Sequence, residues 1–169
     1  MPQISRRRFM EVTAGGVFAA GLATRTPSQA VAQEKKGADI RYGLVTYQWG
    51  KDWDLPSLIE NCAKAKAFGV ELRTTHKHGV EPTLSGADRE DVRKRFANSP
   101  VKCLGIGSNE RFDSPDAATL KKAIDATKAF VELSHDIGGS GVKVKPDSFH
   151  KDVPREKTIE QIGRSLNEV

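Results

Sequence analysis

The sequence predicts an α/β fold in which parallel strands alternate with helices. From Ile40 onward, short runs rich in β-forming residues alternate with longer segments of helical period, which is typical of βα units around a parallel sheet. Inside two of the strands, charged residues alternate with apolar ones, as in VELR and VKVK. These charges require a polar central mouth, as in a barrel. We therefore predict a TIM-barrel-like arrangement of four βα units, an incomplete barrel, with consecutive strand order and all helices on the outer face.

Each predicted element has a recognisable start or stop signal. Asp54 is a suitable N-cap for the first helix, whose apolar residues recur every three or four positions up to Phe68, and Gly69 is expected to end it in the left-handed conformation. In the last helix, Ile159, Ile162 and Leu166 are expected on one face. The predicted strands are residues 40–48, 70–73, 101–106 and 141–144, and the predicted helices begin at residues 54, 85, 114 and 154.

Four βα units are fewer than either common parallel architecture uses. An open doubly wound sheet has about five or six strands, and a closed barrel has about eight. A four-stranded half-barrel leaves the outer edges of its first and last strands unpaired. We therefore expect residues 40–169 to be the N-terminal half of a barrel, and we expect self-association through the exposed strand edges.

The first residues have the pattern of an export signal. Residues 1–32 combine a cationic start, an apolar stretch and small residues that end in Ala30-Val31-Ala32. The pair Arg6-Arg7 resembles the twin-arginine signal, which directs folded cargo to export. The apolar stretch is shorter than a membrane-spanning helix requires. We predict cleavage after Ala32, a polar linker over residues 33–39, a periplasmic or secreted protein, and no stable membrane anchor.

Composition and charge exclude several classes of protein. The chain has 169 residues, of which 37% are hydrophobic and 29% charged, with a formal net charge of +5. Residues 1–32 hold four arginines and one acidic residue, so the rest of the chain has 23 cationic and 21 anionic residues. This near balance argues against nucleic-acid binding. The two cysteines, Cys62 and Cys103, fall on predicted core faces and are interpreted as packing residues.

In parallel α/β folds, candidate functional residues lie at the carboxyl ends of the strands. Tyr47 follows the first predicted strand, where an aromatic ring can either stack on a sugar or pack at the barrel mouth. Glu71 and Arg73 point to the same side of the second strand, where they either orient a polar substrate or form a structural ion pair. Lys143 and Lys145 likewise share one side of the fourth strand.

Two of the loops predicted at the strand ends contain further candidates. The loop after the second strand holds His76, His78 and Glu81, which are possible metal ligands. Their spacing within a loop favours contact with solvent or substrate, and we assign no metal ligand to this chain. Ser108, in a loop expected after the third strand, offers a hydroxyl for a phosphate or sugar oxygen.

Four segments together resemble a known family. The segments VELRTTHKHGVEP, GIGSNERFDSPD, GVKVKP and VPREKTIEQIGRSLNEV, in this order and spacing, resemble the sugar phosphate isomerase/epimerase group of the xylose isomerase-like TIM barrels. The resemblance covers all of residues 40–169 but only the N-terminal half of the family's barrel. It implies a small-molecule sugar or sugar phosphate as the partner. The substrate side of the mouth implied by the resemblance includes Glu71, Arg73, His76, Ser108, Lys143 and Lys145. With Tyr47, placed at the end of the first strand, these are the predicted substrate-binding residues.

The resemblance also implies what this chain lacks. Family members bind a divalent metal, Mn²⁺ or Mg²⁺, through acidic residues and a histidine on later strands, and they move a proton or hydride between adjacent sugar carbons. We therefore expect an exported isomerase- or epimerase-like protein that is metal-dependent in its full-length family and inactive as this chain alone. The alternative is a non-catalytic exported module that binds a sugar or a partner protein through the same mouth.

Overall fold

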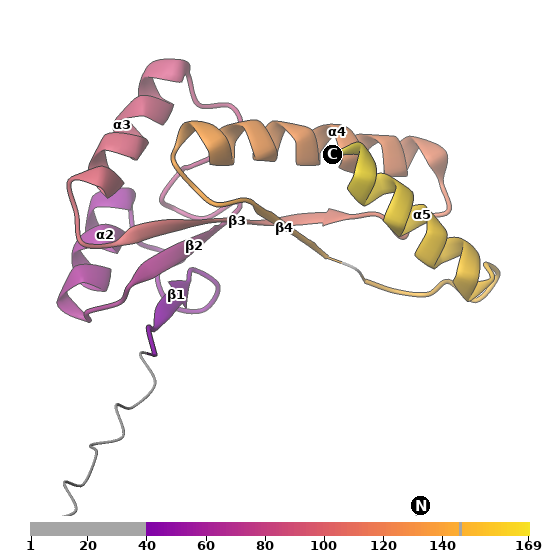
Figure 1. Cartoon of the computed structure of the whole chain (residues 1–169), viewed down its shortest axis with the longest axis horizontal. Helices are drawn as coiled ribbons and strands as arrows, with labels where there is room; N and C mark the ends of the chain where they lie inside the picture. The colour runs from indigo at the N-terminus through magenta and orange to yellow at the C-terminus, as the bar shows by residue number, and fades with distance from the viewer. Residues whose placement is uncertain (1–39, 146) are drawn as a thin grey trace, which may run out of the picture. The chain divides into compact units, whose positions relative to one another are not determined.

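The fold is a parallel sheet with helices on one face. The computed structural model describes residues 40–145 and 147–169, so the predicted signal peptide and linker lie outside the described residues. The described strands form one sheet in the order β1-β2-β3-β4, with every neighbouring pair parallel (Figure 1). The strands are β1 (Gly43–Val45), β2 (Gly69–Arg73), β3 (Lys102–Arg111) and β4 (Val142–Lys145).

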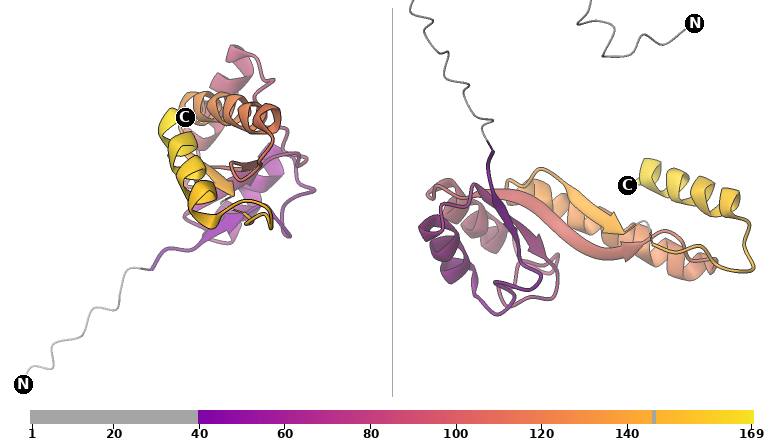
Figure 2. Two further views of the ribbon diagram at one scale, coloured as in Figure 1. Left: turned by 90° about the vertical axis from the view of Figure 1, so that its right-hand side faces the viewer. Right: turned by 90° about the horizontal axis from the view of Figure 1, so that it is seen from below.

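Helices follow each strand, as the βα pattern predicts. When the sheet is viewed from below, β3 and β4 lie in front of α4 (Figure 2). Consecutive strand order with helices on one face confirms the predicted partial barrel and excludes a doubly wound sheet for the described residues. The helices are α2 (Leu55–Lys64), α3 (Gly86–Ala97), α4 (Ala117–Asp136) and α5 (Arg155–Glu168).

The main core lies between the sheet and helices α2, α3 and α4. Val70 and Leu72 from β2 are fully buried, and they pack in one cluster with Leu58 of α2, Phe96 of α3 and Leu133 of α4. Strand residues two apart point to the same face, so the residues between them must face away from the helices. Cys62 and Cys103 are both free thiols buried in this core, as predicted.

A second, smaller cluster holds α5 to the rest of the fold. Phe112, after β3, is buried with Ala123 and Ile124 of α4, and Ile162 of α5 packs against them. Gln161 of α5 donates hydrogen bonds from Nε2 to the carbonyl oxygens of residues 112 and 114, at 2.8 and 2.9 Å. The other predicted apolar residues of this helix, 159 and 166, are exposed. Positions i, i+3 and i+7 lie within about 60° of one another around a helix, so the three residues do share one side of α5, but only Ile162 packs against the second cluster.

The end of α2 differs from the prediction. The helix ends at Lys64, and Lys66, with φ of 56°, adopts the left-handed conformation that was expected of Gly69. Gly69 instead is the first residue of β2. A Cβ at this position would lie 2.7 Å from the side chain of Leu104 and from the carbonyl oxygen of Lys102, so a larger residue would not fit. Glycine is needed here for close strand packing and not for a helix cap.

Two strand boundaries also differ from the prediction. Strand β1 is only three residues long, and the aromatic run that follows it belongs to a turn-rich loop. Strand β3 extends to Arg111, so residues 107–111, which follow the predicted end of the strand at residue 106, are part of the strand. A bulge where β3 pairs with Val70 and Glu71 keeps the two strands together over this length.

Candidate functional site on the inner face

The candidate site lies on the inner face, which we define as the face of the sheet opposite the helices. Its residues alternate along the strands with residues that pack in the two core clusters. The arrangement confirms that Glu71 and Arg73 share one side of β2 and that the two lysines share one side of β4. The inner-face residues discussed below are Glu71, Arg73, Gly107, Asn109, Lys143 and Lys145.

An ion pair crosses β3 at the middle of the inner face. The Nζ atom of Lys143 on β4 contacts the Oε1 atom of Glu71 on β2, although β3 lies between these strands. Gly107 of β3 makes the crossing possible, because a Cβ there would meet Glu71 Oε1 and Arg73 Cδ. Glu71 thus pairs with a lysine two strands away, so the structural ion pair with Arg73, one of the two alternatives considered from the sequence, is not the pair that forms. A pocket of about 230 Å³ lies beside this pair.

Arg73 brings an uncompensated positive charge to the carboxyl end of β2. Only 9% of the residue is exposed. Its Nη2 atom donates to Asn109 Oδ1 at 2.6 Å, its Cζ atom lies 5.5 Å from the centre of the Tyr47 ring, and its buried Nε has no hydrogen-bond partner. No carboxylate in the described part of the chain forms an ion pair with it. Because a buried charge normally has a counter-ion, the geometry suits an anionic ligand.

Thr46 joins the ends of β1 and β2. Its fully buried hydroxyl accepts a hydrogen bond from the main-chain N–H of Arg73 at 2.9 Å and lies 3.1 Å from Nδ1 of His76. Partial burial, followed by the nearby charge of Arg73, lowers the pKa of His76. Both effects favour the neutral imidazole, and the Thr46 hydroxyl holds its Nδ1 atom near the end of β2. Sequence reasoning missed Thr46, whose signal is a polar residue at the carboxyl end of a strand.

His78 has a different role from His76. It is buried, its Nδ1 accepts from the main-chain N–H of Val80 at 3.1 Å, and its Nε2 lies 2.8 Å from the carbonyl oxygen of Arg73. The N–H of Val80 requires a lone pair on Nδ1, so the ring is neutral with its proton on Nε2. Burial also lowers the pKa of His78. Both nitrogens are used within the chain, which leaves none for a metal.

Glu81, the third residue considered as a metal ligand, is also used locally. Its Oε1 accepts from the main-chain N–H of Thr75 at 2.5 Å, and burial raises the pKa of the carboxyl group. Within residues 40–145 and 147–169, no group of three or more histidine, cysteine, aspartate or glutamate side chains could hold a metal ion. The described residues therefore do not fit a divalent metal centre.

The remaining predicted residues lie in different environments. Ser108 is fully buried, and its hydroxyl donates to the carbonyl oxygen of Lys143 at 3.0 Å and accepts from the N–H of Glu110 at 3.3 Å. Ser108 thus ties β3 to β4 and is not brought together with the inner-face side chains. Lys145 lies in register with Arg111 near the end of β4. Tyr47 is 59% exposed above Arg73.

Comparison with known proteins supports the fold. No protein-family model matches the chain, and no curated protein matches it by sequence. Among solved structures, the crystal structure of D-psicose 3-epimerase in the presence of D-fructose is similar, with a TM-score of 0.61 and 16% sequence identity. The match covers 76% of this chain and 46% of that chain. The chain therefore has the fold of a partial TIM barrel and spans about half the length of this epimerase.

Proposed function

We propose that this chain is the sugar-binding half of a sugar isomerase- or epimerase-like barrel, and that its inner face binds an anionic sugar such as a sugar phosphate. The observation that carries the proposal is the buried guanidinium of Arg73, which has an unpartnered Nε and no carboxylate counter-ion among the described residues. Its place at the carboxyl end of a parallel strand is where TIM barrels bind their ligands. The likeness to D-psicose 3-epimerase supports a sugar as the ligand.

The neighbouring side chains would contact different parts of a sugar phosphate: the phosphate, the hydroxyl groups and the apolar face of the ring. Arg73 supplies positive charge for the phosphate, whereas the Glu71–Lys143 pair is internally neutral and offers hydrogen bonds to hydroxyl groups. The exposed ring of Tyr47 provides a flat apolar surface for the sugar carbons. His76, held by Thr46, places a neutral imidazole beside them. Ser108 can contribute only by supporting Lys143.

Catalysis is proposed to need residues outside this chain. In the family that the sequence resembles, a divalent Mn²⁺ or Mg²⁺ would supply positive charge at the reacting sugar carbons, and we expect its ligands on later strands. Because the described residues do not fit such a centre, we expect this chain alone to bind sugar without isomerising it. A non-catalytic sugar-binding module would bind in the same way, and product analysis of a polypeptide that contains later strands would distinguish the two.

Calorimetric titration tests the binding proposal. We expect a ketohexose 6-phosphate to bind more tightly than the unphosphorylated ketohexose. Replacing Arg73 with Gln should weaken phosphate-ester binding by about tenfold to a hundredfold, since a charge-assisted hydrogen bond is lost. Lys122→Gln, at an exposed site on α4, is the matched control and should change nothing. Equal affinity for the two sugars, or an effect of Lys122→Gln as large as that of Arg73→Gln, would contradict the proposal.

Export is a separate proposal. The pair Arg6-Arg7 and the small residues before position 33 support twin-arginine export and cleavage after Ala32. Within the described residues, no helix is long and apolar enough to cross a membrane. Replacing both arginines with lysine should leave the precursor in the cytoplasm of a bacterial host. Unchanged appearance of the mature chain in the periplasm would show that the twin-arginine assignment is wrong.

A further inference from the structure

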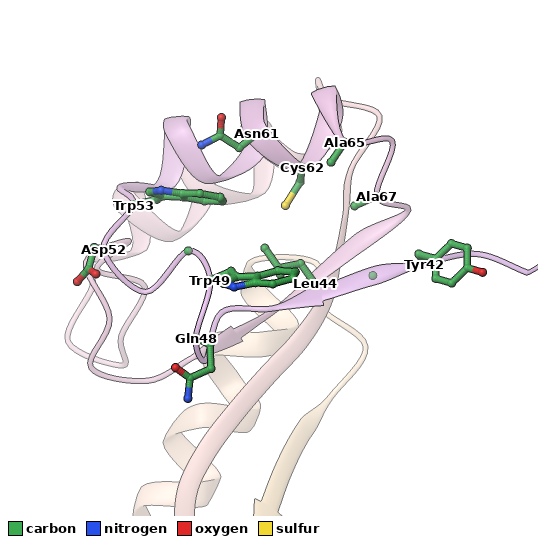
Figure 3. Close-up of a pocket in the computed structure, with 12 residues that line it drawn as sticks. Tyr42, Leu44, Gln48, Trp49, Asp52, Trp53, Asn61, Cys62, Ala65 and Ala67 are labelled. Atoms are coloured by element: carbon green, nitrogen blue, oxygen red, sulfur yellow. The ribbon is translucent and has the colours of Figure 1, made fainter.

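A second pocket lies on the helix side of β1, away from the inner face. Its volume is about 520 Å³. The indole rings of Trp49 and Trp53 face each other across it, and the sulfur of Cys62 on α2 points into the gap (Figure 3). Trp49 is 76% exposed. We call this gap between the two indoles the tryptophan slot.

The tryptophan slot belongs to a larger apolar surface at the edge of the sheet. Ile40 and Tyr42, which precede β1, are both exposed, and Tyr42 also lines the slot. Within the described chain, β1 pairs with β2 only, so its other edge presents unpaired main-chain groups. An open strand edge next to exposed apolar side chains is a typical docking surface for another strand and helix.

The opposite end of the sheet carries a matching apolar stripe on α5. Ile159 is 58% exposed and Leu166 is 50% exposed, and Gly163 lies between them at helical spacing. A Cβ added at Gly163 would meet nothing within 4 Å, so nothing in the fold requires glycine there. Glycine within a helix is less stable than alanine, and a flat helix surface that lets another element approach closely is a physical reason to keep it. We call these three residues the α5 stripe.

We propose that the tryptophan slot binds the α5 stripe of a second copy of this chain. Within one chain, α2 packs beside α3, and α3 beside α4. The helices therefore follow one another in chain order along the outer face of the sheet. The slot is on the open side of α2, where a preceding helix would lie, and α5 is the helix at the other end of the row. A two-fold arrangement would place α5 of each copy in the slot of the other, and the outer edge of β4 beside β1.

The proposed dimer would cover the open strand edges at both ends of the sheet. Two sheets of four parallel strands supply the eight strands that a closed barrel of this kind uses. Closure would cover both strand edges, the slot and the stripe, and it would enclose the inner face between the copies. The inference does not rest on the proposed sugar chemistry, because it uses only the edges and apolar surfaces of the fold.

Sedimentation velocity and tryptophan fluorescence test the proposal together. The chain has two tryptophans, and both line the slot, so the emission reports directly on its occupancy. We expect a dimer whose emission shifts to the red as dilution dissociates it. A monomer at all concentrations would overturn the proposal. A monomer with the emission of buried indoles would also overturn it, by showing that another segment or ligand fills the slot.

Substitution of Gly163 tests whether the α5 stripe is the surface that occupies the tryptophan slot. Gly163→Arg places a long charged side chain on the stripe, in open space, and should raise the dimer dissociation constant about tenfold or more. Gly163→Ala is the matched control: it should stabilise the helix, and because one methyl group intrudes on the contact much less than an arginine does, it should weaken dimerisation much less than Gly163→Arg. Circular dichroism checks that both variants are folded. If Gly163→Arg dimerises as well as the wild type does, the α5 stripe is not the occupant and the proposal is wrong.

Discussion

The two faces of the sheet are built from neighbouring residues but are used differently. In β2, Val70 and Leu72 are fully buried under the helices, while Glu71 and Arg73 face the opposite side. The helix-covered face is apolar and closely packed, whereas the inner face holds charges, a glycine and an unpartnered guanidinium nitrogen. The comparison teaches that packing is concentrated on one face, whereas the proposed ligand binding uses the other. Substitutions one residue apart should therefore have different effects.

The largest effect should follow truncation on the helix-covered face. Leu72→Ala removes a fully buried side chain and should lower the free energy of unfolding by about 2–5 kcal/mol. Glu71→Ala, one residue away on the inner face, breaks a partly exposed ion pair and should cost on the order of 1 kcal/mol. Urea denaturation measures both variants. Equal losses would show that the inner face contributes to stability as much as the core does.

Two glycines of β3 allow a second comparison. Gly105 has φ of +130°, and a Cβ there would collide with the main-chain carbonyl of Gly141, so Gly105→Ala should cost about 1–3 kcal/mol or more. Gly107→Ala meets only the side chains of Glu71 and Arg73, which can move. It should cost less stability than Gly105→Ala but weaken anion binding. Thermal melts combined with calorimetric titration separate the two outcomes, and a reversed order would contradict the assignment of Gly107 to the site.

The two histidines of the same loop should differ in their dependence on pH. Because the pKa of His78 is lowered in the folded state, the unfolded chain binds its proton more tightly. The contribution of His78 is complete above its unfolded pKa of about 6.5 and is lost as the pH falls below it, at up to about 1.4 kcal/mol per pH unit. His78→Asn keeps an acceptor for Val80 N–H and should flatten this dependence.

His76→Asn is the control for the pH experiment, since His76 is less buried than His78. His76→Asn should change the pH dependence of the unfolding free energy less than His78→Asn does. The measurement is urea denaturation between pH 5 and pH 8. A larger change for His76→Asn than for His78→Asn would mean that the wrong histidine has been assigned the structural role.

The smallest change in stability should follow the loss of the Arg73 guanidinium. An apolar side chain of similar length avoids burying a charge that has an unpartnered nitrogen, so Arg73→Met should leave the unfolding free energy unchanged within about 1 kcal/mol, or raise it slightly. The same variant should lose the preference for a phosphorylated sugar. A strong loss of stability would show that Arg73 is a structural residue and would remove the main support for the proposed site.

Sequence reasoning succeeded where local chemistry decides the outcome. The caps Asp54 and Ser85 begin their helices as predicted, because a side-chain oxygen at this position satisfies main-chain N–H groups nearby. Alternation placed Arg73 and Lys143 on the inner face correctly, because successive strand residues point to opposite faces.

Local patterns failed where the partner is distant in the chain. Gly69 was predicted to be a helix cap, but the constraint on it comes from Leu104 and Lys102 of the adjacent strand. Glu71 pairs with Lys143, 72 residues away, and no pattern of spacing reveals this contact. His76 and His78 look equivalent in the sequence, yet only His78 has both ring nitrogens occupied by main-chain groups.

The sequence by itself therefore determined the βα order, the helix starts, the polar side of each strand and the resemblance to sugar isomerases, because all of these depend on periodicity, caps and residue order. The tertiary structure alone decided which charges are paired, that Arg73 lacks a counter-ion among the described residues, and that Ser108 supports the sheet from within. It also placed both tryptophans around one slot. These features depend on distances between residues far apart in the chain, which only folding brings together.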